Sequence, residues 1–260
     1  MSEQVTAEVR LVGLDGIPEV RPGDDLGALL GDAIERAGVG LLPGDVVVVT
    51  HKVVSKAEGR LVRLAEVTPS AFAERLAAQS GKDARQVEVV LRESERIVRM
   101  DRGVLICETR HGFVCANAGV DASNVEAETV CLLPEDPDRS AAGLRTALAE
   151  SFGLAEPFAP GVVVTDSWGR PWRNGIVNFA IGVAGLAPVV DYRGHHDPAG
   201  YELGVTVLAA ADEIAAASEL VMHKLAARPA ALVRGWAPPI AAAAGTGRDL
   251  VIDPARDLFR

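Results

Sequence analysis

The sequence is poor in aromatic residues and in cysteine. Only 4% of its 260 residues are Phe, Trp or Tyr, and its three cysteines, Cys107, Cys115 and Cys131, show no CxxC spacing. The absence of a CxxC pair excludes the usual zinc-binding patterns. All three lie in apolar surroundings, which favours buried free thiols in a reducing compartment such as the cytoplasm.

Positive charge is also scarce, since the formal net charge is −10. Nonspecific nucleic-acid binding needs clustered positive charge, so we expect no nucleic-acid partner. A bound polyanion would require a local basic pocket or metal ions. The N-terminus lacks the basic and apolar regions of a signal peptide. The most apolar long stretch is interrupted by Asp212, Glu213 and Glu219, so we expect no membrane span.

Four common catalytic or nucleotide-binding motifs are missing. The chain contains no GxxxxGK[ST] loop, no GxGxxG between a strand and a helix, no GxSxG and no HExxH. If the protein binds a nucleotide, it must therefore do so in a way that uses neither a standard P-loop nor a Rossmann fingerprint.

Hydrophobic periodicity predicts interleaved strands and helices. Strands are predicted at 6–14, 44–55, 96–100, 103–109, 112–120, 161–166 and 230–235. Helices are predicted at 24–39, 68–81, 82–94, 137–153 and 201–226. Runs of consecutive strands between helices favour an α+β fold with mixed sheets over a doubly wound sheet. We expect one domain over 1–235, with a smaller lobe around 70–115, and a linker or tail over 236–260.

The segment "TDSWGRPWRNG", Thr165–Gly175, concentrates functional residue types in what is predicted to be one loop. Asp166 and Ser167 offer oxygen ligands for Mg²⁺ or Mn²⁺ where an apolar strand ends. Arg170 and Arg173 could hold phosphate or carboxylate groups, and the two tryptophans could pack as anchors or stack on a planar ligand. The alternative is a surface turn with its Trp side chains tucked into the core.

Two further segments carry candidate residues. "CANAGVDASNVEAET" follows a strand and supplies Asp121 and Asn124, with an Asx-turn and helix cap as the alternative reading. "VVVVTHKVVSKAEGR" supplies Lys52 and Lys56, which could meet phosphates, or could protect a strand edge. The Ala-rich helix contains Asp212 and Glu213, and because an unpaired buried carboxylate is costly, one of them should face solvent or a cation.

Taken in order, four motifs resemble the coenzyme F420:L-glutamate ligases, the CofE family, which also forms the N-terminal domain of FbiB proteins. They are "GDVVVVTHKVVSKAEGR", "ETRHGFVCANAGVDASNV", "VVVTDSWGRPWRNGIVNFAIGVAGL" and "AADEIAAASELVMHK", and the similarity spans roughly residues 8 to 235. FbiB proteins continue into a flavin-binding domain, so this chain would be a stand-alone ligase or the ligase half of such a protein.

The resemblance implies an F420 ligase-type fold, an intertwined homodimer, GTP as co-substrate, two Mg²⁺ or Mn²⁺ ions, and potassium as a candidate activator. It implies metal ligands at Asp121, Asp166, Ser167 and Glu213. It implies GTP contacts at Ile17, Pro18, Glu19, Val20, Lys52, Lys56 and Asn124, and at His51, which stands where a small hydroxyl residue is expected. Asp121, Asp166, Arg170 and Arg173 would carry the chemistry.

The implied reaction joins L-glutamate, and then further γ-linked glutamates, to coenzyme F420-0 through an acyl phosphate. Phosphoryl transfer gathers negative charge, so metal ligands and nearby cations suit it. Two alternatives are a nucleotide- or metal-binding regulatory module without turnover, and an amide ligase acting on a different acid.

Overall fold

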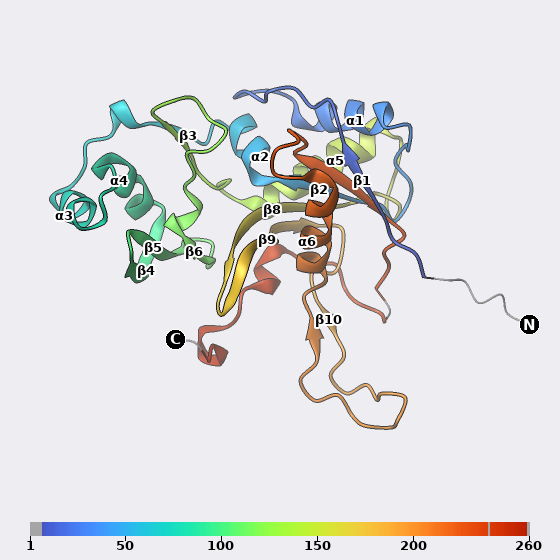
Figure 1. Ribbon diagram of the computed structural model, residues 1–260. Coiled ribbons are helices and arrows are strands. Elements are labelled where there is room, and N and C mark those ends of the chain that lie inside the picture. Colours follow the sequence, from blue (N-terminus) through green and yellow to red (C-terminus); the bar gives the residue numbers. More distant parts are fainter. Residues whose placement is uncertain (1–6, 239, 259–260) are drawn as a thin grey trace, which may run out of the picture.

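A computed structural model describes residues 7–238 and 240–258, and its architecture is α+β (Figure 1). A central five-stranded sheet has the order β1-β12-β2-β8-β9. These strands span Arg10–Leu14, Ala230–Arg234, Val46–Thr50, Gly161–Arg170 and Arg173–Ala184, in that order. β2 and β8 pair in parallel, with Thr50 opposite Thr165, and the other neighbours pair antiparallel.

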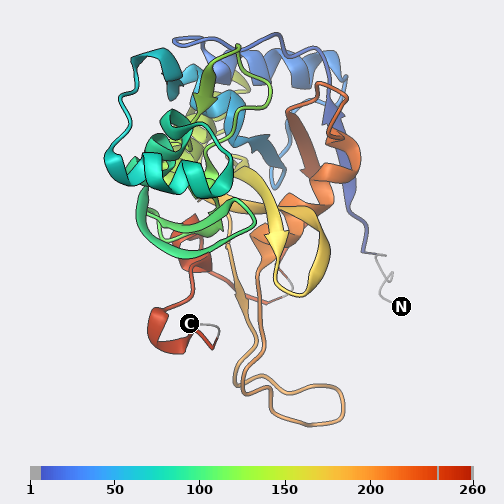
Figure 2. The same ribbon diagram turned by 60° about the vertical axis from the view of Figure 1, so that its left-hand side comes forward.

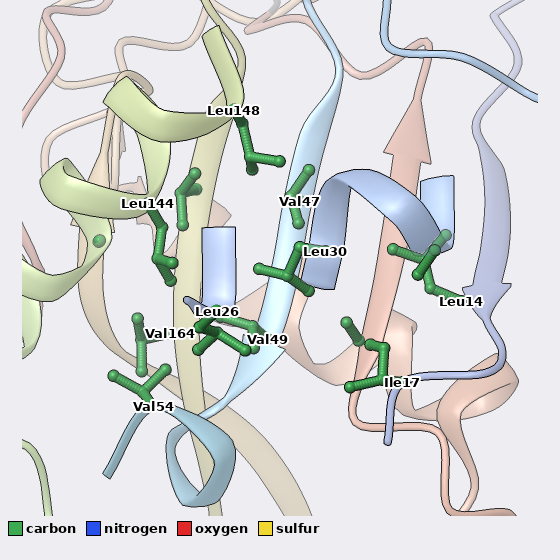
Figure 3. Packing of buried hydrophobic residues seen from close by; sticks show 14 of the residues in the cluster. Leu14, Ile17, Leu26, Leu30, Val47, Val49, Val54, Leu144, Leu148 and Val164 are labelled. Atoms are coloured by element: carbon green, nitrogen blue, oxygen red, sulfur yellow. The ribbon is translucent and has the colours of Figure 1, made fainter. Parts of the chain in front are cut away.

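Helices cover both faces of this sheet, which explains why β2 and β8 are continuous apolar runs rather than alternating ones. On one face, α1 (Leu26–Arg36), α2 (His51–Ala57) and α5 (Pro137–Ser151) enclose the core drawn in Figure 3, including Val47, Val49 and Val164. On the other face, α6 (Ala210–Met222) packs against Val46, Val48 and Val163. Alternate valines of one strand thus fill two separate cores.

A smaller lobe with its own core lies at one side of the sheet (Figure 1). It consists of β3 (Leu61–Arg63), α3 (Ala71–Ser80), α4 (Ala84–Arg92), β4 (Ser94–Asp101), β5 (Val104–Thr109), β6 (Val114–Ala116) and β7 (Thr129–Cys131), with short 3-10 turns at Leu64–Glu66 and Asn117–Gly119. Its core runs from Leu64 to Leu132, so it is wider than the predicted 70–115.

An arm and a C-terminal segment complete the described chain. The arm is built on β10 (Val190–Asp191) and β11 (Val207–Leu208), and it extends away from the body in both views (Figures 1 and 2). The C-terminal segment has 3-10 turns at Gly247–Leu250 and Pro254–Arg256. Within the segment predicted as a linker or tail, Trp236 and Leu250 pack against the core beneath α6. None of the described helices has the length and apolarity that a bilayer span requires.

Three of the sequence predictions for local structure are wrong. The strand predicted over 44–55 ends at Thr50, and helix α2 follows, because His51, Val54 and Ser55 form one buried helical face. The predicted loop 165–175 is the extended end of the β8–β9 hairpin, in which Ser167 pairs with Asn178. The helix predicted over 201–226 begins only at Ala210, after strand β11.

Asp45 anchors the turn that leads into β2. It is 1% exposed and accepts hydrogen bonds from the Leu42 backbone N–H and, in bidentate fashion, from the Arg234 guanidinium at 2.8 and 2.7 Å. The same carboxylate raises the pKa of Arg234. This ion pair joins the start of β2 to the end of β12.

We expect Asp45→Ala to lower the free energy of unfolding by about 3 kcal/mol, because it removes the hydrogen bonds of a buried carboxylate and leaves the partly buried Arg234 without its counter-ion. Urea denaturation measures the change. The control is Glu66→Ala, which removes an exposed pair with Arg63 at 4.0 Å and should cost less than about 1 kcal/mol. Equal effects of the two substitutions would contradict this role for Asp45.

Candidate active site

A cavity of about 410 Å³ lies where the parallel pairing of β2 with β8 ends, at Thr50 and Thr165. Because both strands run in the same direction, the residues that follow Thr50 and Thr165 meet at one edge of the sheet. Most of the residues nominated from the sequence line this cavity. They are Ile17, Pro18, Glu19, Val20, His51, Lys52, Lys56, Asp121, Asn124, Asp166 and Ser167.

Helix α2 presents two lysines to the cavity. Lys52 and Lys56 are one helical turn apart and therefore lie on the same face. Lys52 Nζ lies 2.7 Å from Asp121 Oδ2 and also contacts Ser123, while Lys56 Nζ lies 2.5 Å from Glu19 Oε1. The Lys56 side chain is nearly buried, whereas Glu19 is 73% exposed. An anion entering the cavity could therefore take over part of the lysine contact from Glu19.

Asp121 stands between β6 and β7 and is held by backbone and side-chain contacts. Its backbone pairs with Cys131, and its Oδ1 accepts the Ser123 backbone N–H at 2.6 Å. Burial raises the pKa of Asp121, but hydrogen bonds from Lys52 and Ser123 together outweigh it and lower that pKa below its ordinary value. Asp121 is therefore a carboxylate at neutral pH, fixed in position and charged.

Asp166 and the buried groups around it leave hydrogen-bonding capacity toward the cavity. His51 Nε2 lies 3.3 Å from Asp166 Oδ1, but the two groups are not aligned for a hydrogen bond. No other described residue forms a hydrogen bond with His51 Nε2. Thr165 is 1% exposed, and its Oγ1 also has no partner among the described residues. Because unpaired buried polar atoms are costly, their presence at one cavity indicates that a ligand or water completes the site.

Two contacts of the β8–β9 hairpin at this site, one with α6 and one with the residues after α6, were not predicted. Lys224 Nζ donates to Ser167 Oγ at 2.7 Å, and Asn178 Nδ2 donates to Glu219 Oε2 at 3.2 Å. All four residues line the cavity. A sequence signal for Glu219 does exist. Asp212 and Glu219 are seven residues apart in α6, and residues at that spacing share one side of a helix, so the sequence could have predicted that both face inward.

Three nominated residues do not line the cavity. Arg170 and Arg173 face each other at the tip of the β8–β9 hairpin, and Arg170 donates to the Asn174 carbonyl at 3.4 Å. Glu213, one of the implied metal ligands, is exposed on α6 and lies outside the cavity. Its neighbour Asp212 accepts the Ala180 backbone N–H at 2.9 Å, and burial raises the pKa of Asp212.

The two tryptophans of the hairpin differ in their surroundings. Trp168 stacks on Phe179 with ring centroids 4.9 Å apart, and on its other side Phe113 lies at 6.1 Å. Trp172 is 83% exposed at the hairpin tip. Of the two roles considered for these rings, Trp168 therefore packs as an anchor between the lobe and the hairpin.

The cavity offers oxygen donors for a hard divalent ion, although it does not enclose one by itself. Within residues 7–238 and 240–258, no three His, Cys, Asp or Glu side chains gather as a metal site. Asp121 and Asp166 both line the cavity and suit Mg²⁺ or Mn²⁺, which usually take one or two carboxylates and complete their shell with phosphate and water. Ser167 Oγ accepts one hydrogen bond, from Lys224, and its second lone pair remains for an ion.

The three cysteines are buried free thiols, as predicted. Burial raises the pKa of Cys115 to about 12 and that of Cys131 to about 11. Both thiols are therefore protonated at neutral pH and are unsuited to nucleophilic catalysis there.

Comparison with known proteins assigns a family to most of the chain. Residues 16–235 match the family described as F420-0:Gamma-glutamyl ligase. The coenzyme F420:L-glutamate ligase of Methanopyrus kandleri is 47% identical over 245 residues, which cover 93% of this chain and 94% of that protein. The proteins of the same name from Methanothermobacter thermautotrophicus and Methanocaldococcus jannaschii are 43% and 37% identical, over 88% and 97% of this chain and 89% and 97% of their own lengths.

The Lys52–Asp121 pair generates a prediction about charge. Lys52→Met removes the largest interaction that lowers the pKa of Asp121 and leaves burial, which raises it, so that pKa should rise. Carboxyl-carbon NMR titration measures the change. In the matched control Lys56→Met, the Lys52 contact remains and the pKa of Asp121 should move much less. An Asp121 pKa unaltered by Lys52→Met would show that the pair does not set this charge.

Proposed function

The chain belongs to the F420-0:gamma-glutamyl ligase family, and on that premise we propose that it joins L-glutamate to coenzyme F420-0 at the expense of GTP. The observation that carries the proposal is that one cavity, beside Thr50 of β2 and Thr165 of β8, gathers the nominated residues. Residues from four separate stretches of the sequence, around Ile17, Lys52, Asp121 and Asp166, come together there.

The nucleotide is assigned to the side of the cavity formed by α2 and the 17–20 segment. Lys52 and Lys56 supply positive charge that an otherwise acidic protein needs to accept a triphosphate. Each lysine already holds a carboxylate, Asp121 or Glu19, so each cation is positioned before a ligand arrives. Asn124, beside Asp121, offers amide groups to the nucleotide.

Asp121 and Asp166 are the residues that would hold a divalent ion, Mg²⁺ or Mn²⁺, and we propose two ions in all, with Ser167 at the second and potassium as a further activator. Such ions neutralise charge on transferring phosphoryl groups. The carboxylates suit them because their oxygens are hard ligands, and because Lys52 holds Asp121 and the Ser167 backbone N–H donates to Asp166 at 2.7 Å without enclosing either carboxylate.

The chemistry requires an activated carboxylate, because a carboxylate does not react with an amine directly. The γ-phosphoryl group of GTP passes to the carboxylate of F420-0 and gives an acyl phosphate and GDP. The glutamate amine then replaces phosphate and forms the amide. Catalysis of the first step is mostly positioning and charge neutralisation, which the lysines of α2 and the fixed aspartates can provide.

The activity is tested by incubating the protein with GTP, Mn²⁺, L-glutamate and F420-0 and analysing the products by mass spectrometry. We expect GDP and F420 bearing one or more glutamates. Nucleotide binding without GDP formation would favour a non-catalytic regulatory module. Glutamylation of another acid in a substrate panel, but not of F420-0, would favour a ligase with a different substrate.

Asp166→Asn keeps the shape of the side chain but removes its charge. It should lower the ligation rate at least ~10²-fold, the scale seen when one electrostatic contribution to a transition state is removed. It should also weaken Mn²⁺ binding in the presence of GDP, measured by electron paramagnetic resonance. The control is Asp32→Asn, an exposed residue of α1 outside the cavity. Near-full activity of Asp166→Asn would contradict the assigned role.

We also propose that the chain works as an intertwined homodimer in the cytoplasm, where GTP is abundant. The hairpin tip and the arm project from the body and carry exposed apolar side chains, with Trp172 83%, Val205 89% and Ile176 55% exposed (Figures 1 and 2). Large apolar side chains exposed in this way favour association with another protein surface. A partner copy would also bring Arg170 and Arg173, at the hairpin tip, next to another chain.

Light scattering should therefore give about twice the chain mass of 27.2 kDa. Replacing Val205 and Ile176 together by serine should shift the protein toward the single-chain mass, because it removes apolar surface from the arm and the hairpin. A wild-type protein that is monomeric at micromolar concentration would contradict the proposed assembly.

A further inference from the structure

Glu219 differs from the other carboxylates of the cavity in lacking a cationic partner. Glu19 pairs with Lys56, Asp121 pairs with Lys52, and Asp166 lies beside His51. Glu219 accepts a hydrogen bond from the neutral amide of Asn178 at 3.2 Å and forms no ion pair with any residue in 7–238 or 240–258. A carboxylate beside a cavity without a counter-ion favours a positively charged ligand.

The surroundings of Glu219 are fixed by the β8–β9 hairpin. Asn178 is 3% exposed and lies directly opposite Ser167 in the strand register. Each member of this cross-strand pair is neutral and binds one charged side chain. Asn178 donates to the Glu219 carboxylate, and Ser167 accepts from the Lys224 ammonium group. A carboxylate and an ammonium group are thus positioned by neighbouring residues of one hairpin, an arrangement that matches the two charges of an α-amino acid.

An independent observation shows that this side of the cavity is incomplete without a ligand. Thr165 lies on β8 two residues before Ser167, is 1% exposed and lines the same cavity. Its hydroxyl has no hydrogen-bond partner among the described residues. A buried hydroxyl that lacks a partner can donate to, or accept from, a polar group that enters the cavity.

We propose that Glu219 receives the α-ammonium group of the incoming L-glutamate, with Asn178 as its positioning residue. This inference rests on the proposed function. GTP and F420-0 carry negative charge on their phosphates and carboxylate and would be repelled by Glu219, whereas L-glutamate alone among the three substrates bears an ammonium group. Lys224 lies where it can attract a carboxylate of the same substrate.

The assignment also gives Glu219 a part in amide formation. The glutamate nitrogen must lose a proton before it can attack, and the Glu219 carboxylate accepts that proton. The C–N bond then forms as the bond between the carbonyl carbon and the phosphate oxygen breaks, and the phosphate leaves with that electron pair. The second proton of the nitrogen passes to the departing phosphate, and Glu219 returns its own proton to water.

The test compares Glu219→Gln with wild type in steady-state ligation. A charge-assisted hydrogen bond contributes enough binding that its loss should raise the KM for L-glutamate about tenfold or more, while the KM for GTP stays within about twofold. The matched control is Glu150→Gln, an exposed glutamate of α5 outside the cavity, which should change neither constant. Glu219→Asp keeps the charge and should recover part of the lost affinity.

Glutarate separates recognition of the ammonium group from a general loss of structure, because it has both carboxylates of glutamate and no amine. Its inhibition constant against L-glutamate should be unchanged or lower in Glu219→Gln, whereas a distorted site would weaken the binding of both compounds.

A KM for L-glutamate within twofold of wild type would overturn the proposal. So would a parallel rise in the Mn²⁺ requirement and the KM for GTP, which would make Glu219 a metal ligand. If wild-type protein forms glutamylated product but Glu219→Gln leaves the KM for L-glutamate unchanged, the ligase function stands and the role of Glu219 is wrong. If wild-type protein forms no glutamylated product, both proposals are wrong.

Discussion

The parallel pairing of β2 with β8 is the constraint on which the rest of the site depends. The other neighbouring strands of the central sheet run antiparallel, so an antiparallel arrangement here would have sent the two chain ends to opposite edges. Because Thr50 lies opposite Thr165, where the parallel pairing ends, the residues that follow these two positions meet. One strand delivers His51 and Lys52, and the other delivers Asp166 and Ser167.

The charges of the cavity are arranged in pairs before any ligand is present. An acidic chain can accept anionic substrates only where cations are concentrated, and Lys52 and Lys56 are held in place by Asp121 and Glu19. Fixing each lysine in this way reduces the side-chain entropy lost on binding. The cost is that a ligand must compete with the carboxylates, and the exposed Glu19 can yield more readily than the half-buried Asp121.

The sequence was informative wherever a residue follows a buried apolar strand. Valine runs predict β2 and β8, and Asp166 directly after the second run was nominated from that position. Helix α2 was missed because "VVVVTHKVVS" reads as one long strand, and only the burial of His51, Val54 and Ser55 on one helical face distinguishes it. The hairpin at 165–175 was missed because glycine, proline and polar residues are typical of loops, whereas its pairing depends on β9.

Contacts between elements distant in sequence were beyond such reasoning. Glu219 and Lys224 enter the site only because α6 packs across β9, and Glu213, equally acidic and in the same helix, points to solvent. Arg170 and Arg173 are close in sequence to Asp166, but an extended hairpin carries them away from the cavity. Proximity along the chain thus favoured cations that lie outside this cavity, whereas tertiary packing brings Lys224 into it.

The proposed function requires that the edge where β2 and β8 stop pairing forms one site for nucleotide and metal. Anomalous diffraction at the manganese edge, from crystals grown with GDP and Mn²⁺, tests it most directly. The account predicts manganese bound by both Asp121 and Asp166, with the nucleotide phosphates beside Lys52 and Lys56. Manganese and nucleotide bound outside this cavity, or the two aspartates bound to no common ion, would contradict it.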